Sequence, residues 1–158
     1  MIFAFGNCKL DVDVDKTKAY YKTAKTVTGD CSCDGCRNYV EAIDFLPKEV
    51  TTFFAQLGID MKKPREVYSI NESAGGTLPY GGWYHVCATI IQGENPVVYT
   101  SENQTYSIDE TKTFSITDDF KIYFSEKCDL LENDFPRPAI QLEIMVKMPW
   151  VLDEEHKL

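Results

Sequence analysis

Three cysteines, Cys31, Cys33 and Cys36, lie within six residues of one another, directly before an amphipathic helical pattern. A disulfide between such close neighbours would close a very short loop, so it would remove little entropy from the unfolded chain. Thiolates at this spacing can instead bind one metal ion or take part in thiol chemistry. This cysteine cluster (Cys31, Cys33 and Cys36) is therefore the first candidate for a functional site.

Cys33 and Cys36 have the spacing of a zinc knuckle, in which two thiolates on a tight turn containing glycine reach one tetrahedral ion. Cys31 is close enough in sequence to supply a third ligand. No second pair of cysteines at this spacing follows, so the pattern is incomplete as a zinc signature. Ordinary packed and reduced cysteines are the first interpretation of this pattern, and a structural zinc at these three cysteines is the alternative.

The fourth ligand has to come from elsewhere in the chain. His85 and Cys87 are the best candidates, because an extended chain places residues two apart on the same face of one strand. Cys8 and Cys128 come next. The preferred interpretation of His85 is nevertheless a structural histidine, with its ring nitrogens hydrogen-bonded inside the core, and the ligand role is the alternative.

The same cluster also allows a thiol-dependent enzyme or a redox sensor. If Asp34 caps the following helix, Cys36 falls in its first turn, where exposed backbone amides and the helix dipole favour a thiolate. Arg37 adds positive charge, whereas Asp30 and Asp34 act in the opposite sense. No order of cysteine, histidine and acid matches a known nucleophile signature, so the sequence assigns no catalytic residue.

The elements that must position these residues begin with a strand and a helix. Lys9 to Val14 alternate polar and apolar, which predicts a half-buried strand, and Asp15 then predicts the cap of a helix over residues 16–25. After the cluster an apolar stripe leads to Pro47, which predicts the start of a further helix that Gly58 ends. Short helices thus occupy the first part of the chain.

The second half of the chain is rich in strand patterns. Residues 66–71, 83–91, 105–108, 113–116 and 120–124 are the shorter candidates. The clearest strand covers residues 140–148, where isoleucine, leucine and valine occupy every second position until Pro149. The segment Tyr80–Tyr84, with two central glycines, predicts a tight turn that leads aromatic side chains into the core, and a binding edge is its alternative.

We therefore predict a single α+β domain over residues 1–152, with an N-terminal strand and short helices packed on a mainly antiparallel sheet. Residues 153–158 are predicted to be a C-terminal tail. A chain of 158 residues is long enough to bury a continuous apolar core. We find no internal repeat and no linker between domains.

The chain is acidic, with a formal net charge of -9. This charge opposes a role in nucleic-acid binding, which depends on concentrated lysine and arginine, and it disfavours anionic membranes as well. The longest apolar runs fall far short of the roughly 20 residues of a membrane-spanning helix, and the first residues lack the pattern of a secretion signal. We therefore expect a cytoplasmic protein with reduced thiols.

Four segments together resemble a family of small proteins from Gram-positive bacteria for which no activity is established. They are Cys31–Asn38, Leu57–Asp60, Tyr80–Val86 and Pro149–Leu152, read as CSCDGCRN, LGID, YGGWYHV and PWVL. The resemblance covers nearly the whole chain and implies a bacterial cytosolic protein. It implies no substrate, cofactor or catalytic residue.

For function, these observations predict a non-catalytic binding or accessory module with a protein or a small molecule as its partner. Zinc is the one cofactor that the sequence suggests, at Cys31, Cys33 and Cys36. The alternative is a thiol-dependent enzyme or redox sensor that uses the same cysteines.

Overall fold

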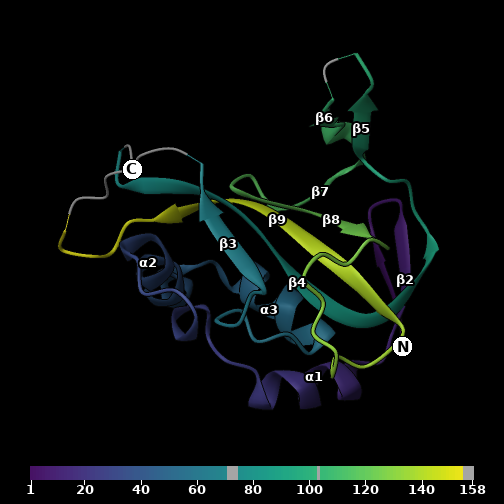
Figure 1. Ribbon diagram of the computed structural model, residues 1–158, viewed down its shortest axis with the longest axis horizontal. Helices are drawn as coiled ribbons and strands as arrows, with labels where there is room; N and C mark the ends of the chain where they lie inside the picture. Colours follow the sequence, from purple (N-terminus) through teal and green to yellow (C-terminus); the bar gives the residue numbers. More distant parts are fainter. Residues whose placement is uncertain (71–74, 103, 155–158) are drawn as a thin grey trace.

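The computed structural model describes residues 1–70, 75–102 and 104–154, and it has an α+β fold with helices packed against a mainly antiparallel sheet (Figure 1). The predicted fold class is thus confirmed. The strands are β1 (Ile2–Phe5), β2 (Cys8–Val12), β3 (Glu66–Ser69), β4 (Thr77–Gln92), β5 (Val97–Thr100), β6 (Thr105–Ile108), β7 (Phe114–Thr117), β8 (Phe120–Ser125) and β9 (Ala139–Pro149). The helices are α1 (Val14–Thr23), α2 (Asp34–Ala42) and α3 (Lys48–Leu57), with short 3₁₀ turns η1 (Val27–Gly29), η2 (Ile43–Phe45) and η3 (Glu110–Lys112).

The main sheet is antiparallel and has the strand order β1-β2-β4-β9-β8-β7. Strand β3 also pairs with β4, through Tyr80–Trp83, while β2 pairs with the other end of β4. Strands β5 and β6 form a separate hairpin that projects from the body of the protein (Figure 1). Strands β2 and β3 therefore pair with different parts of the same edge of β4.

Strand β9 has the buried face that its alternating sequence predicts. The alternating side chains from Ile140 to Met148 are all at most 5% exposed, and β9 lies between β4 and β8. Burial of such a row of branched side chains fixes the register, because a slip of one residue would turn every one of them to the other face. The prediction of a central core strand is confirmed.

The helices begin and end close to the predicted positions. Helix α1 is capped by Asp13 rather than Asp15, so Val14 belongs to the helix and the strand before it ends at Val12. Helix α3 follows Pro47 and ends at Gly58, whose φ of 80° is left-handed, as predicted. A Cβ at Gly58 would also lie only 2.7 Å from the backbone oxygen of Val14, so the close packing of α1 on α3 needs a glycine there.

Helix α1 completes an edge of β4 that no strand covers within the described residues. Between its pairings with β3 and β2, β4 exposes the backbone of His85 and Cys87 on this edge. The Tyr21 hydroxyl donates to the His85 oxygen at 2.8 Å and accepts from the His85 N–H at 3.2 Å. The Cys87 N–H donates to Thr17 Oγ1 at 3.0 Å. Side-chain hydroxyls thus take the place of a neighbouring strand.

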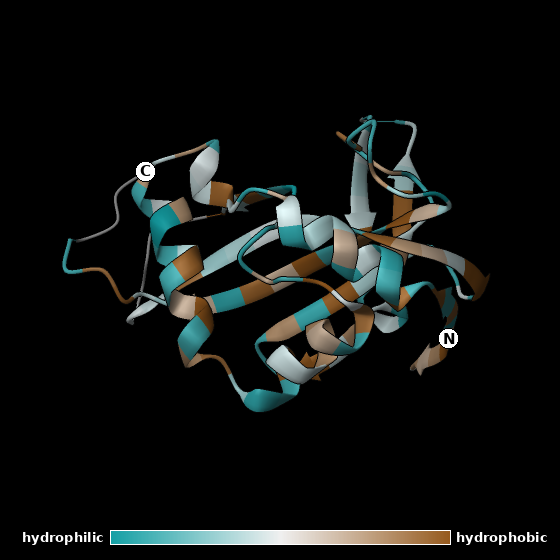
Figure 2. Ribbon diagram, turned by 90° about the horizontal axis from the view of Figure 1, so that it is seen from below, coloured by the Kyte–Doolittle hydropathy of each residue, from teal (hydrophilic) through white to brown (hydrophobic). Residues whose placement is uncertain are grey.

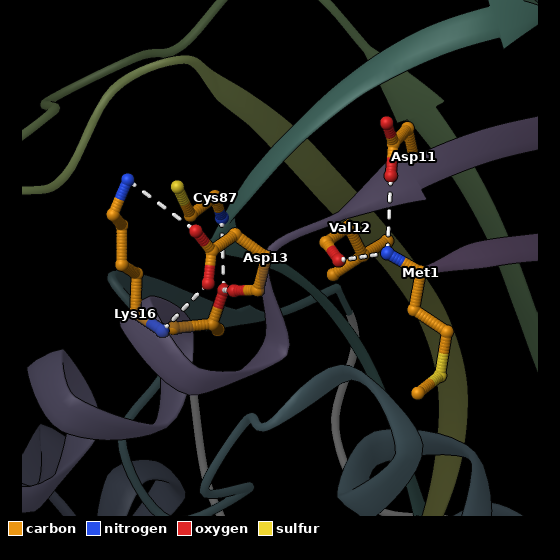
Figure 3. A network of polar contacts seen from close by, with 7 residues as sticks. Met1, Asp11, Val12, Asp13, Lys16 and Cys87 are labelled. Carbon is orange, nitrogen blue, oxygen red and sulfur yellow. Dashed lines mark hydrogen bonds and ion pairs between the residues drawn. The ribbon is translucent and has the colours of Figure 1, made fainter.

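The start of α1 is fixed beside this edge by a small polar network (Figure 3). Asp13 accepts the Lys16 N–H at 3.0 Å, and its other carboxylate oxygen lies 3.3 Å from the Lys16 ammonium. The Asp13 N–H also donates to the Cys87 oxygen at 2.8 Å. The amino group of Met1 contacts Asp11 and the Val12 oxygen, so β1 and β2 are joined at the same end of the sheet.

Buried aromatic side chains join the helices to the sheet. The Tyr39 hydroxyl of α2 lies 2.5 Å from that of Tyr84 on β4, which donates in turn to the Met61 oxygen at 2.6 Å. Phe54 of α3 packs edge-on against Tyr84, with ring centroids 5.0 Å apart. Hydrophobic segments alternate with polar ones along the helices and the strands behind them (Figure 2). The rings therefore supply apolar area while their hydroxyls stay hydrogen-bonded.

The segment Tyr80–Tyr84 lies inside β4, so the predicted turn is wrong. A Cβ at Gly82 would lie 2.5 Å from the Glu66 oxygen, and one at Gly81 would lie 2.5 Å from the Tyr68 ring. The two glycines thus allow β3 to approach β4 closely. None of the helices in the described part of the chain is long and apolar enough to cross a bilayer.

The position of β9 predicts that Ile144→Asp unfolds the protein. Ile144 is 1% exposed and pairs with Gly82 on one side and Ile122 on the other. An unpaired carboxylate there costs more than about 4 kcal/mol, which is a large part of the stability of a small domain. Thermal unfolding followed by circular dichroism measures this. Lys147→Asp, on the exposed face of the same strand, is the control, and a wild-type midpoint for Ile144→Asp would contradict the prediction.

The two central glycines of β4 should differ in their tolerance of alanine. Gly82→Ala forces a methyl group against the β3 backbone, whereas Gly81→Ala meets the half-exposed Tyr68 side chain, which can rotate away. We expect Gly82→Ala to lower the free energy of unfolding by more than about 1 kcal/mol and Gly81→Ala to lower it less. Urea denaturation of both variants gives the order, and the reverse order would show that Tyr68 is the fixed neighbour.

Candidate metal centre

The cysteine cluster forms where the chain turns from η1 into α2. The Cys31 N–H donates to the Val27 oxygen at 3.1 Å, so the chain leaves η1 in a tight turn. Cys33 is extended, with a ψ of 160°, and α2 begins at the next residue. Cys36 then falls in the first turn of the helix, which brings its side chain back toward the two cysteines of the loop.

The three sulfur atoms converge. All lie within 4.8 Å of one another, and the Sγ atoms of Cys31 and Cys33 are 3.2 Å apart. Sulfur ligands of one tetrahedral zinc, each about 2.3 Å from the ion, are about 3.8 Å from one another. The spacing therefore requires only small side-chain movements for all three cysteines to bind one ion. The group could hold a metal ion with three protein ligands.

Cys33 has a second role as the N-cap of α2. Its Sγ accepts the Cys36 N–H at 3.4 Å, a position that serine, threonine or aspartate occupies in most helices. The prediction of Asp34 as the cap is wrong, because the Asp34 carboxylate instead accepts the N–H of the adjacent Gly35 at 2.8 Å.

The three thiols differ in their exposure to solvent. Cys31 and Cys33 are exposed, whereas Cys36 is 4% exposed. The Cys33 backbone N–H next to the Cys31 sulfur lowers the pKa of that thiol, and the neighbouring thiols act in the same direction. Burial raises the pKa of Cys36 well above its usual range. The expectation that Cys36 is the favoured thiolate is therefore wrong, because loss of hydration outweighs the helix terminus.

Two buried polar residues hold the start of α2 against the sheet. The Tyr80 hydroxyl of β4 donates to the Gly35 oxygen at 2.5 Å and accepts from the Asn38 amide at 3.4 Å. Asn38 also donates to the Pro149 oxygen at 3.1 Å and accepts the Val151 N–H at 2.8 Å. These contacts position the cluster, and the sequence analysis did not assign them. An asparagine inside a short amphipathic helix was the one local signal of such a role.

The structure does not bring His85 and Cys87 to the cluster. Tyr84 points toward the helices, and His85 and Cys87 lie one and three positions further along the strand, so both lie on the opposite face of β4. Within the described residues, the group of potential metal ligands around Cys33 contains only the three cysteines. His85 and Cys87 thus share one face of β4, as expected, but that face points away from α2.

His85 is part of a buried hydrogen-bonded row. Its Nε2 lies 3.2 Å from Gln141 Oε1, and the Gln141 amide donates to Glu143 at 2.5 Å. Phe135 packs edge-on against the imidazole, with ring centroids 5.7 Å apart. Burial lowers the pKa of His85 and raises the pKa of the Cys87 thiol. Both side chains are therefore uncharged members of the core.

Comparisons of this chain with protein-family models, with curated proteins and with solved structures found no match.

The electrostatics predict the order in which the thiols react. Cys31 should be alkylated faster than Cys36 at every pH from 6 to 9, because an exposed thiol with a lowered pKa is ionised at lower pH than a buried one with a raised pKa. Peptide mass spectrometry of chelator-treated protein after short exposure to iodoacetamide gives each rate. Cys128, which is partly exposed and whose pKa is raised by burial, is the internal control. Faster modification of Cys36 would contradict this electrostatic description.

Proposed function

We propose that the protein is a non-catalytic binding or accessory module in which Cys31, Cys33 and Cys36 hold one zinc ion. The observation that supports this most strongly is the convergence of the three sulfur atoms within 4.8 Å of one another. The ion takes three thiolates from the chain and its fourth ligand from water or a partner. Such a site ties the loop before α2 to the first turn of the helix.

Zinc suits the chemistry of the donor set. Thiolate sulfur is a soft ligand, and zinc accepts three or four such ligands without a preference imposed by d electrons. The Cys36 N–H and the start of α2 offset part of the negative charge of the complex. Binding displaces protons, so the raised pKa of Cys36 makes the site weaker at acidic pH than at neutral pH.

The surroundings of the cluster favour binding over catalysis. His85 lies on the other face of the sheet, and the Arg37 guanidinium is already paired with Glu154 at 3.1 Å. A metal-activated water would need a nearby base to accept its proton, and neither group supplies one. In this proposal the partner is a protein or a small molecule rather than nucleic acid or a membrane, because the net charge is -9. A cytoplasmic location, where thiols stay reduced, fits the six free cysteines.

One observation supports redox sensing as the second candidate. Cys31 combines exposure with a lowered pKa, and the Cys33 sulfur lies 3.2 Å away. A peroxide would oxidise the Cys31 thiolate to a sulfenic acid, and the Cys33 thiolate would then displace hydroxide from that sulfur to form a disulfide. A bound zinc ion would block both steps by occupying the thiolates.

Elemental analysis tests the proposed zinc site. Protein purified without a histidine tag under reducing conditions should contain about one equivalent of zinc, and Cys33→Ser should lose it together with part of the thermal stability. Cys8→Ser is the matched control, since Cys8 is partly buried on β2, outside the cluster. Zinc affinity should rise as pH increases from 6 to 8, because protons compete for the thiolates.

The outcome separates the two candidates. Absence of metal, with an unchanged melting curve for Cys33→Ser and a Cys31–Cys33 disulfide after mild peroxide treatment, would favour the redox sensor. Absence of both metal and disulfide would leave the cysteines as packing groups.

A further inference from the structure

We propose that the end of the sheet formed by β2, β4, β7 and β8 binds a small uncharged molecule with an aromatic or branched aliphatic body. A cavity of about 490 Å³ lies there, lined by residues from both strand pairs. This volume is typical of small-molecule sites. The cavity shares no residue with the cysteine cluster, so this site goes beyond the proposed metal function and is independent of it.

The cavity follows from unequal strand lengths. Strand β9 begins at Ala139, opposite Cys87, whereas β4 continues to Gln92. Strand β8 ends at Ser125, opposite Gln141. The end of β4 therefore pairs with β2 on one side, while no strand in the described part of the chain pairs with its other side.

Apolar side chains form one part of the cavity wall, and polar side chains form the rest. Phe5 lies between Phe114 and Phe124, with ring centroids 5.9 Å from each. Ile90 of β4 and Ile122 of β8 complete the apolar lining. Rings at these separations leave edges and faces for another ring or a branched chain to pack against. The body of the ligand is therefore aromatic or aliphatic.

The charges around the cavity exclude an anionic ligand. The Lys112 ammonium lies 3.3 Å from Glu94, and the Lys127 ammonium lies 3.5 Å from Asp129, so both lysines in the lining are already paired. Glu126 adds a further carboxylate. An anion would meet no free positive charge and would be repelled by the acidic protein. An uncharged ligand avoids both costs.

A polar end of the ligand has a partner at the cavity mouth. Asn7, in the turn between β1 and β2, lines the cavity and is exposed. Its side-chain amide makes no hydrogen bond to another group in the described ranges of the chain. The amide can donate to a carbonyl and accept from a hydroxyl, so the ligand can carry either group at one end.

Fluorescent probes test the site and its preference for uncharged molecules. N-phenylnaphthylamine, which is uncharged, should bind saturably to the full chain, whereas the anionic anilinonaphthalenesulfonate should bind at least about tenfold more weakly. Ile90→Trp fills the cavity and should weaken N-phenylnaphthylamine binding at least about tenfold. Ile91→Trp is the matched control, because Ile91 is 52% exposed and points to the other face of the same strand. Equal binding of both probes, or equal binding by both variants, would overturn the proposal.

Cys8 provides a second measurement on the unmodified protein, which decides the matter even if Ile90→Trp fails to fold. The Cys8 thiol lines the cavity beside Gly93. Saturation with N-phenylnaphthylamine should slow the alkylation of Cys8 in proportion to occupancy and leave Cys128 unaffected, since Cys128 lies outside the cavity lining. An unchanged Cys8 rate at saturation would place the probe elsewhere and overturn the proposal.

Discussion

The antiparallel pairing of β4 with β9 is the interaction on which the rest of the structure depends. It runs from Thr77 opposite Pro149 to Cys87 opposite Ala139, and every other strand of the main sheet is added outside this pair. A slip of one residue would exchange Tyr84, which meets the helices, with His85, which meets the opposite face. The aromatic contacts to α2 and α3 and the buried row at His85 would be lost together. One register thus decides both faces of the sheet.

Local patterns predicted a large part of this fold. Residues 140–148 alternate so regularly that only a strand with one buried face fits them, and Gly58 ends α3 as its position indicates. The glycines at 81 and 82 predicted a turn wrongly, because consecutive glycines usually mark one. Here they permit the approach of β3, which lies elsewhere in the sequence. Strands β1 and β5 went unpredicted.

The candidate site also combines features that the sequence predicts with features that only the folded structure shows. Cys31, Cys33 and Cys36 are found from sequence because the local turn into α2 brings them together. The contacts of Asn38 with Tyr80 and Pro149 depend on how the helix docks on the sheet, which spacing alone does not encode. Two-residue spacing correctly predicts a shared face for alternate residues of β4, but the topology decides which face meets the helices. The pKa of Cys36 likewise depends on burial by distant residues.

The double role of the Cys33 sulfur has a consequence for how chemical events at the cluster spread through the protein. The same atom caps α2 and faces the other two thiols, so it cannot be oxidised or alkylated without weakening the hydrogen bond from the Cys36 amide. The first turn of α2 is connected through Asn38 to the segment after β9. Covalent modification of one sulfur would thus be recorded as faster amide hydrogen exchange, first at the helix start and then near Val151. The rate of amide hydrogen exchange near Val151 therefore depends on the chemical state of a cysteine more than a hundred residues earlier in the chain.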